Sequence, residues 1–149
     1  MSALRELYQE MIVDHSKRPR NFGVLSDANH TKEGFNPLCG DRLTVYLQEH
    51  NHVIDKVKFE GCGCAISVAS ASLMTEVLQG KTQAEADAVF NDFIQLVTKG
   101  HDASLEERLG KLAVFAGVVE FPVRVKCATL PWHTFKAALQ DDPQSVSTE

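Results

Sequence analysis

The sequence lacks several features that would assign it to a large class of proteins. No apolar run approaches the ~20 residues that span a bilayer, so we expect no membrane partner. The net charge of −5 argues against a nucleic-acid partner, because phosphate contacts need a basic field. The first residues, MSALRELYQEM, lack the apolar core of a secretory signal, so we expect a cytoplasmic protein. The chain also lacks internal repeats.

The composition is that of one ordinary globular domain. The 149 residues are 44% hydrophobic and 23% charged, which is enough chain for one core and too little for two domains. We therefore expect residues 1–140 to form a single domain. The polar tail DDPQSVSTE, residues 141–149, is predicted to be disordered.

The first part of the chain is predicted to contain one helix and two strands. Apolar residues recur at helical spacing over residues 2–14. A loop rich in Gly, Asn and Pro follows and ends at GFNPLCGD, residues 34–41. Apolar and polar residues alternate over residues 43–48, and residues 53–61 return as a second strand after a turn. Two such strands imply a small antiparallel sheet.

The rest of the chain is predicted to be mainly helical. Thr82 with Glu85, and Ser104 with Glu107, stand at capping-box spacing before two helical patterns. The segment FPVRVK, residues 121–126, is predicted to be extended, because a proline disfavours helix at the residue before it. Strands followed by helices indicate an α+β fold, with a small antiparallel β-sheet packed against several α-helices. The later helices are expected over residues 66–77, 86–97, 105–115 and 131–139.

The cysteines occupy positions at which thiol or metal chemistry is plausible. In a cytoplasmic protein, four unevenly spaced cysteines favour such chemistry over structural disulfides. Cys64 and Cys127 each precede a predicted helix, and a helix N-terminus favours a thiolate. Cys39 lies in a turn in which Gly40 lets the backbone bend, so that its thiol and the Asp41 carboxylate can approach one point.

These residues leave two interpretations open. Three thiolates and one carboxylate would make a tetrahedral site that suits zinc, or iron in a sulfide cluster. Alternatively, each cysteine is a small buried hydrophobic residue, which is common for free cysteines. The spacing of the cysteines matches no zinc-finger pattern.

Four segments of the sequence resemble a known family. They are HSKRPRNFG, NPLCGDRL, GCAISVASASLMTE and RVKCATLPWHTF. On these motifs the chain is similar, over nearly its whole length, to the U-type iron–sulfur cluster assembly proteins (SufU, IscU and NifU N-terminal-like). The resemblance implies a SufE/NifU-like, or IscU-like, architecture.

Two features are similar to the SufU branch of this family, which is associated with zinc and sulfur transfer. The IscU branch usually has a histidine immediately before its last cysteine, and this sequence has Lys126 there. The sequence also has an additional helical stretch over about residues 95–118, between the second and third cysteine motifs.

The resemblance implies a ligand set and a function. Cys39, Asp41, Cys64 and Cys127 would hold zinc, or alternatively an iron–sulfur cluster. Cys62 falls where relatives typically carry another residue, so we expect it to be a neighbour of the site. The chain would act as a zinc-dependent sulfurtransferase, in which Cys39 accepts persulfide sulfur from a SufS-like cysteine desulfurase and serves downstream iron–sulfur assembly or acceptor proteins.

Two other functions remain open at this point. The same ligands would serve a scaffold that assembles an iron–sulfur cluster and transfers it. A thiol redox protein using Cys62 and Cys64 is the other alternative, although the disulfide ring between them would be small and strained.

Two groups of basic residues are candidates for supporting roles. Three thiolates and a carboxylate around a dication leave a net charge of −2, so a nearby cation would help. Arg124, at a position that matches the family, and Lys126 would share a face of an extended segment, and the alternative is a solvated basic edge. Lys17, Arg18 and Arg20 form a basic cluster that would suit an acidic patch on a partner, or simply a solvated surface.

Overall fold

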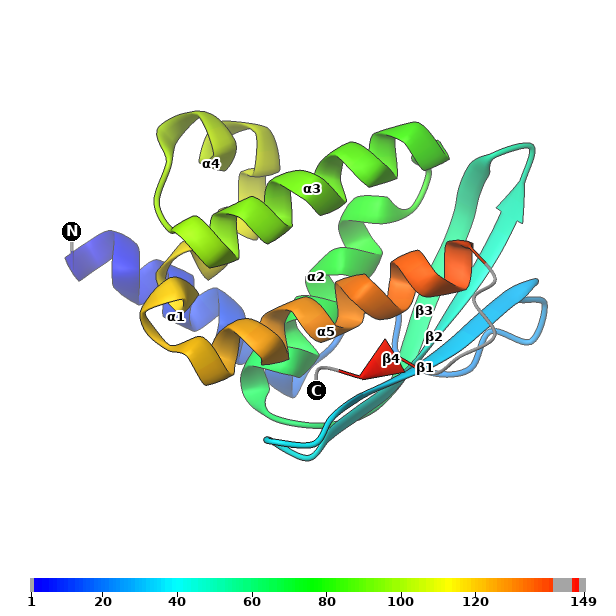
Figure 1. The fold of residues 1–149 in the computed structure, drawn as a ribbon, viewed down its shortest axis with the longest axis horizontal. Coiled ribbons are helices and arrows are strands. Elements are labelled where there is room, and N and C mark those ends of the chain that lie inside the picture. Colours follow the sequence, from blue (N-terminus) through cyan, green and yellow to red (C-terminus); the bar gives the residue numbers. More distant parts are fainter. Residues whose placement is uncertain (1, 141–145, 148–149) are drawn as a thin grey trace.

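The computed structural model describes the backbone of residues 2–140 and 146–147, and the side chains from residue 6 onward (Figure 1). None of the described helices is long and apolar enough to cross a bilayer. In chain order the elements are α1 (Ser2–Lys17), β1 (His30–Asn36), β2 (Asp41–His50), β3 (Val53–Cys62), α2 (Ala65–Leu78), α3 (Gln83–Lys99), α4 (Ala103–Leu109), the 3-10 helix η1 (Gly110–Glu120), α5 (Pro122–Leu139) and β4 (Val146–Ser147). The helices α2 and α5 pack against the sheet, and α3 packs against α5 and η1.

The sheet has the strand order β3-β2-β1-β4. The pairs β2/β3 and β1/β2 are antiparallel, and β4 adds two residues parallel to β1 beside Gly34 and Phe35. The predicted α+β class and the two predicted strands are confirmed. Apart from the β4 residues, the tail that we predicted to be disordered lies outside the described residues, and the single-domain boundary stays a prediction.

Strand β1 was missing from the sequence-based prediction, which placed a loop there. Its sequence, HTKEGFN, does not alternate apolar and polar residues. One of its buried positions is Gly34, where a Cβ atom would collide with the Thr134 side chain of α5. The strand thus meets α5 by close backbone approach rather than through a large apolar side chain, which is why its hydrophobic pattern is weak.

The beginning of α5 corrects a second prediction. The segment 121–126 is not extended, because Pro122 is the first residue of a helix that runs to Leu139. Phe121 before it has φ −129° and ψ 88°, so the restriction on the residue before a proline holds there, and the proline itself suits the first helical turn. Pro131, expected to start a helix, lies inside one. Consequently Cys127 lies in the second turn of α5 and not before a helix.

The helix caps were predicted with mixed success. Thr82 and Glu85 form both hydrogen bonds of a capping box at the start of α3, as predicted. The second predicted box is wrong, because Asp102 is the N-cap of α4 and accepts hydrogen bonds from the backbone N–H groups of Ser104 and Leu105. The additional stretch before the last cysteine motif is helical, since it contains the end of α3, α4 and η1.

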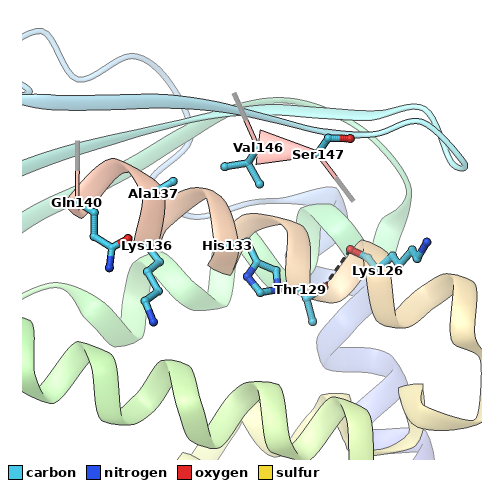
Figure 2. Close-up of a pocket in the computed structure, with 8 residues that line it drawn as sticks. All are labelled: Lys126, Thr129, His133, Lys136, Ala137, Gln140, Val146 and Ser147. Carbon is cyan, nitrogen blue, oxygen red and sulfur yellow. Dashed lines mark hydrogen bonds between the residues drawn. The ribbon is translucent and has the colours of Figure 1, made fainter. Parts of the chain in front are cut away.

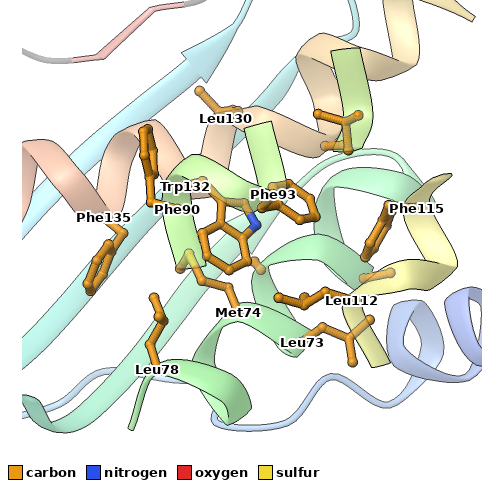
Figure 3. Packing of buried hydrophobic residues seen from close by; sticks show 14 of the residues in the cluster. Leu73, Met74, Leu78, Phe90, Phe93, Leu112, Phe115, Leu130, Trp132 and Phe135 are labelled. Carbon is orange, nitrogen blue, oxygen red and sulfur yellow. The ribbon is translucent and has the colours of Figure 1, made fainter. Parts of the chain in front are cut away.

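The core lies between the sheet and the helices α2, α3, η1 and α5, and its helical part holds α5 in place (Figure 3). The Trp132 indole stacks on Phe93 with ring centroids 4.5 Å apart. Its Nε1–H donates to the Ser70 hydroxyl at 3.1 Å, and that hydroxyl donates to the Ala128 carbonyl at 2.6 Å. The serine of α2 therefore joins the core to the turn of α5 that carries Cys127.

Candidate metal centre

Three of the four predicted metal ligands come together at one end of the sheet. Cys39 lies in the turn between β1 and β2, Asp41 is the first residue of β2, and Cys127 comes from α5. One ligand atom from each lies within 4.8 Å of the others, and the two Sγ atoms are 3.2 Å apart. Two sulfur donors and one carboxylate suit zinc or iron, so the residues present fit the metal that the sequence implies.

The ligands differ strongly in exposure. Cys39 is exposed on its turn, whereas Asp41 and Cys127 are 2% and 1% exposed. Burial raises the pKa of the Cys127 thiol, and its hydrogen bonds with Cys39, Asp41 and Cys64 raise that pKa further. The raised pKa favours the protonated thiol, which donates to the Cys39 sulfur.

Cys64 adjoins this group through its backbone. It is the N-cap of α2, as predicted, and its N–H donates to Asp41 Oδ1 at 2.8 Å. The preceding Gly63 permits this approach, because a Cβ there would lie 2.5 Å from the same carboxylate oxygen. The Cys64 thiol interacts with that of Cys127 but lies outside the 4.8 Å group of described residues. Its role as the fourth ligand stays a prediction.

Asn36 is a site residue that the sequence interpretation missed. It is the last residue of β1, is fully buried, and pairs with Asp41 across the β1/β2 ladder. Its Nδ2 atom donates to Asp41 Oδ2 at 3.0 Å and to Cys127 Sγ at 3.3 Å. Prediction of β1 as a strand would have placed Asn36 opposite Asp41 and would have pointed to it.

Cys62 lies beside the candidate metal centre without joining the ligand group. It is the last residue of β3, is exposed, and faces Arg42 in the β2/β3 ladder. Its interpretation as a neighbouring thiol stays a prediction.

The proposed charge partners do not share a face. Residues two apart on a helix point in widely different directions, so the helical start of α5 removes the common face expected for Arg124 and Lys126. The Arg124 guanidinium lies over the Phe121 ring, 4.8 Å from its centroid. Lys126 lines a cleft of about 520 Å³ along α5, in which it and Lys136 extend in different directions (Figure 2). Their role in charge compensation stays a prediction.

The basic cluster at the end of α1 is partly neutralised within the chain. Arg18 and Arg20 lie 3.3 and 2.6 Å from carboxylate oxygens of Asp14, and Lys17 is exposed. The hydrogen bond from Arg20 is the largest cause that lowers the pKa of Asp14. The use of this cluster for partner docking stays a prediction.

The structure is that of a small α+β protein in which two cysteines and one aspartate form a group that could hold a metal ion. Residues 7–128 match the sequence model of the family described as NifU-like N terminal domain. The chain therefore belongs to the U-type iron–sulfur cluster assembly family, and the predicted resemblance is confirmed.

Named relatives represent both branches of the family. The chain is 42% identical over 132 residues to the zinc-dependent sulfurtransferase SufU of Bacillus subtilis (strain 168). This alignment covers 87% of the chain and 86% of the relative. It is 38% identical over 140 residues to the iron–sulfur cluster assembly scaffold protein IscU of Streptococcus pyogenes serotype M1, covering 94% and 87%. A crystal structure of a candidate SUF-system scaffold from Fervidobacterium islandicum AW-1 superposes with a TM-score of 0.82 at 38% identity, covering 91% and 98%.

Proposed function

We propose that the protein accepts sulfur from a SufS-like cysteine desulfurase, as a zinc-dependent sulfurtransferase that serves iron–sulfur cluster assembly. The observation that carries this proposal is the exposed Cys39 thiol, 3.2 Å from the buried Cys127 thiol in one ligand group. The similarity to a relative named zinc-dependent sulfurtransferase supports it.

The size of the ligand group favours a single metal ion. At a tetrahedral zinc with Zn–S distances of about 2.3 Å, two sulfur ligands are about 3.8 Å apart. The ligand atoms of Cys39, Asp41 and Cys127 already lie within 4.8 Å of one another, and Cys64 would complete the set. Bound zinc would hold the cysteine ligands as thiolates.

The transfer itself is a displacement between sulfur atoms. The Cys39 thiolate attacks the terminal sulfur of the desulfurase persulfide, a new S–S bond forms at Cys39, and the bond to the desulfurase cysteine breaks. That cysteine leaves as a thiolate, so the electrons balance without an added oxidant. The exposed turn of Cys39 suits this step, since the sulfur of a second protein must approach in line with the bond that breaks.

We place this activity in the cytoplasm, where thiols are kept reduced, and expect the sulfur to pass to downstream iron–sulfur assembly or acceptor proteins.

A specific observation also favours a second candidate function, a scaffold that assembles and transfers a cluster. The Streptococcus pyogenes relative is named a scaffold protein, and its similarity to this chain covers 94% of the chain. The residue before Cys127 favours the first candidate, because it is Lys126 and not the histidine usual in the scaffold branch.

Elemental analysis of protein purified without air and without added metal separates the two candidates. About one zinc per chain and no sulfide would fit a closed site and support the sulfur acceptor. Iron with matching sulfide would support the scaffold. The zinc protein should then gain the mass of one sulfur atom when it is incubated with a cysteine desulfurase and L-cysteine, and no gain would overturn the sulfurtransferase proposal.

A further inference from the structure

We infer that Asn36 is a positioning residue that fixes Asp41 and Cys127 as the immobile half of the metal site. This inference rests on the proposed function, because it concerns the same ligand group. It begins from a fully buried polar side chain whose hydrogen-bond donors point at two predicted ligands.

The donor inventory of the amide matches this arrangement. A carboxamide nitrogen carries two hydrogens. In Asn36 one is directed to Asp41 Oδ2 at 3.0 Å and the other to Cys127 Sγ at 3.3 Å. Both donors are therefore committed to ligands that come from different elements, β2 and α5.

The backbone of Asn36 reaches the third ligand residue in a different way. The Cys39 N–H donates to the Asn36 carbonyl at 3.3 Å, which closes the turn between β1 and β2. This bond holds the turn through the backbone of Cys39. Asn36 therefore restrains the ligand atoms of Asp41 and Cys127 through its side chain, and the turn of Cys39 through its backbone.

Neutral donors also suit the charge of the site. Neither Arg124 nor Lys126 forms an ion pair with Asp41 among the described residues, and both oxygens of this carboxylate accept hydrogen bonds from neutral N–H groups. Asn36 donates to one of its oxygens, and the Cys64 backbone donates to the other. Hydrogen bonds to charged acceptors are stronger than neutral ones and orient the ligand.

The test uses the full metal-free chain, with zinc affinity measured by competition with a chromophoric chelator. Asn36→Ala should bind zinc about 10–100-fold more weakly, as is typical when a residue that supports a metal ligand is lost. Asn36→Asp, nearly identical in shape, should bind more weakly still, because it sets a carboxylate against Asp41 and Cys127. Thr134→Val is the matched control, because Thr134 is also fully buried and its hydroxyl donates to the Leu130 carbonyl within α5. The zinc affinity of this variant should equal that of the unaltered chain.

Cobalt(II) absorption provides a readout that a purely structural role would not move. Thiolate-to-cobalt bands report the sulfur ligands, so Asn36→Ala should weaken them through loss of the Cys127 contact, and Thr134→Val should not. Unchanged zinc affinity and cobalt bands in Asn36→Ala would overturn the inference and leave the proposed function intact. Failure of both Asn36 variants to fold without metal, beside a folded control, would make Asn36 structural and also overturn it. Absence of zinc binding by the unaltered chain would instead overturn the proposed function.

Discussion

The two sides of the metal centre are built differently. On the turn side, Cys39 is exposed, its backbone N–H donates to the Asn36 carbonyl, and its sulfur accepts a hydrogen bond from the Cys127 thiol. On the helix side, Cys127 is buried in α5, accepts a hydrogen bond from Asn36, and lies next to Ala128, whose carbonyl is bonded to Ser70 of the core. The helix side is therefore more confined than the turn side.

This difference fits a protein that must bind a metal and also react. A thiolate on a metal is a weaker nucleophile than a free one, so one sulfur has to leave before it can attack. If every ligand were as confined as Cys127, that departure would disturb the core. We therefore propose that Cys39 reacts and that Cys127 and Asp41 retain the metal.

The largest expected effect comes from removing the reactive thiol. Cys39→Ser should abolish sulfur acceptance, because a serine hydroxyl cannot form a stable persulfide. Intact-mass measurement after desulfurase turnover gives the readout. If Cys39→Ser still gains sulfur, another cysteine is the acceptor, and the proposed difference between the turn side and the helix side is wrong.

For zinc affinity we expect the opposite order from that for sulfur acceptance, with the larger loss on the helix side. Cys127→Ser should weaken zinc binding by more than about 100-fold, beyond the effect of losing a residue that only supports a ligand. Cys39→Ser should weaken it less, because the exposed ligand can be replaced by water. Chelator competition on both variants checks the ranking, and equal losses would contradict it.

The helix side should also depend on its link to the core. Ser70→Ala removes the acceptor for the buried Trp132 Nε1–H and the donor to the Ala128 carbonyl. Unpaired buried polar groups of this kind cost about 1–3 kcal/mol, so the free energy of unfolding in urea should fall by that amount. A change well below that range would show that this link does not support α5.

A smaller effect should appear in the pH dependence of stability, away from the metal centre. His15 of α1 is buried against Ser72, and burial, followed by the charge of Arg20, lowers its pKa below the ordinary value of 6.5. The unfolded chain binds this proton more readily, so the contribution of His15 to stability is present above about pH 6.5 and declines as the pH falls below it.

Urea unfolding of the metal-free chain between about pH 5 and 8 measures this slope. His15→Gln should reduce it, whereas His101→Gln, at an exposed position, is the surface control. An unchanged slope in His15→Gln would assign the pH dependence to other groups.

The smallest expected effect concerns the exposed neighbour of the site. Cys62→Ser should leave zinc affinity and sulfur acceptance unchanged, since Cys62 lies outside the ligand group. Loss of either property would place Cys62 in the site. A thiol redox activity that the unaltered chain shows and Cys62→Ser lacks would favour the thiol redox alternative.

Much of the fold and of the candidate ligand group could be predicted from local signals. Strands β2 and β3 alternate apolar and polar residues, and Thr82 with Glu85 caps α3. The glycine-flanked turn and the segments around the cysteines led to Cys39, Asp41 and Cys127, which the structure brings together.

The missed features depend on contacts between distant parts of the chain. Strand β1 is weak in hydrophobic pattern because Gly34 meets α5 through its backbone. The start of α5 was misplaced because Pro122 permits either an extended segment or a first helical turn, and packing decides. Asn36 carries no signal by itself, because its role requires β1 to be paired with β2 and α5 to lie across their end.

Mapping the persulfide to a single cysteine tests the central claim most directly. The zinc-loaded chain would be turned over with a cysteine desulfurase and L-cysteine, alkylated, digested, and analysed by peptide mass spectrometry. We predict the extra sulfur on the peptide containing Cys39 and none on the peptide containing Cys127. Extra sulfur on Cys127, with Cys39 unmodified, would contradict the division between a reactive turn side and a fixed helix side.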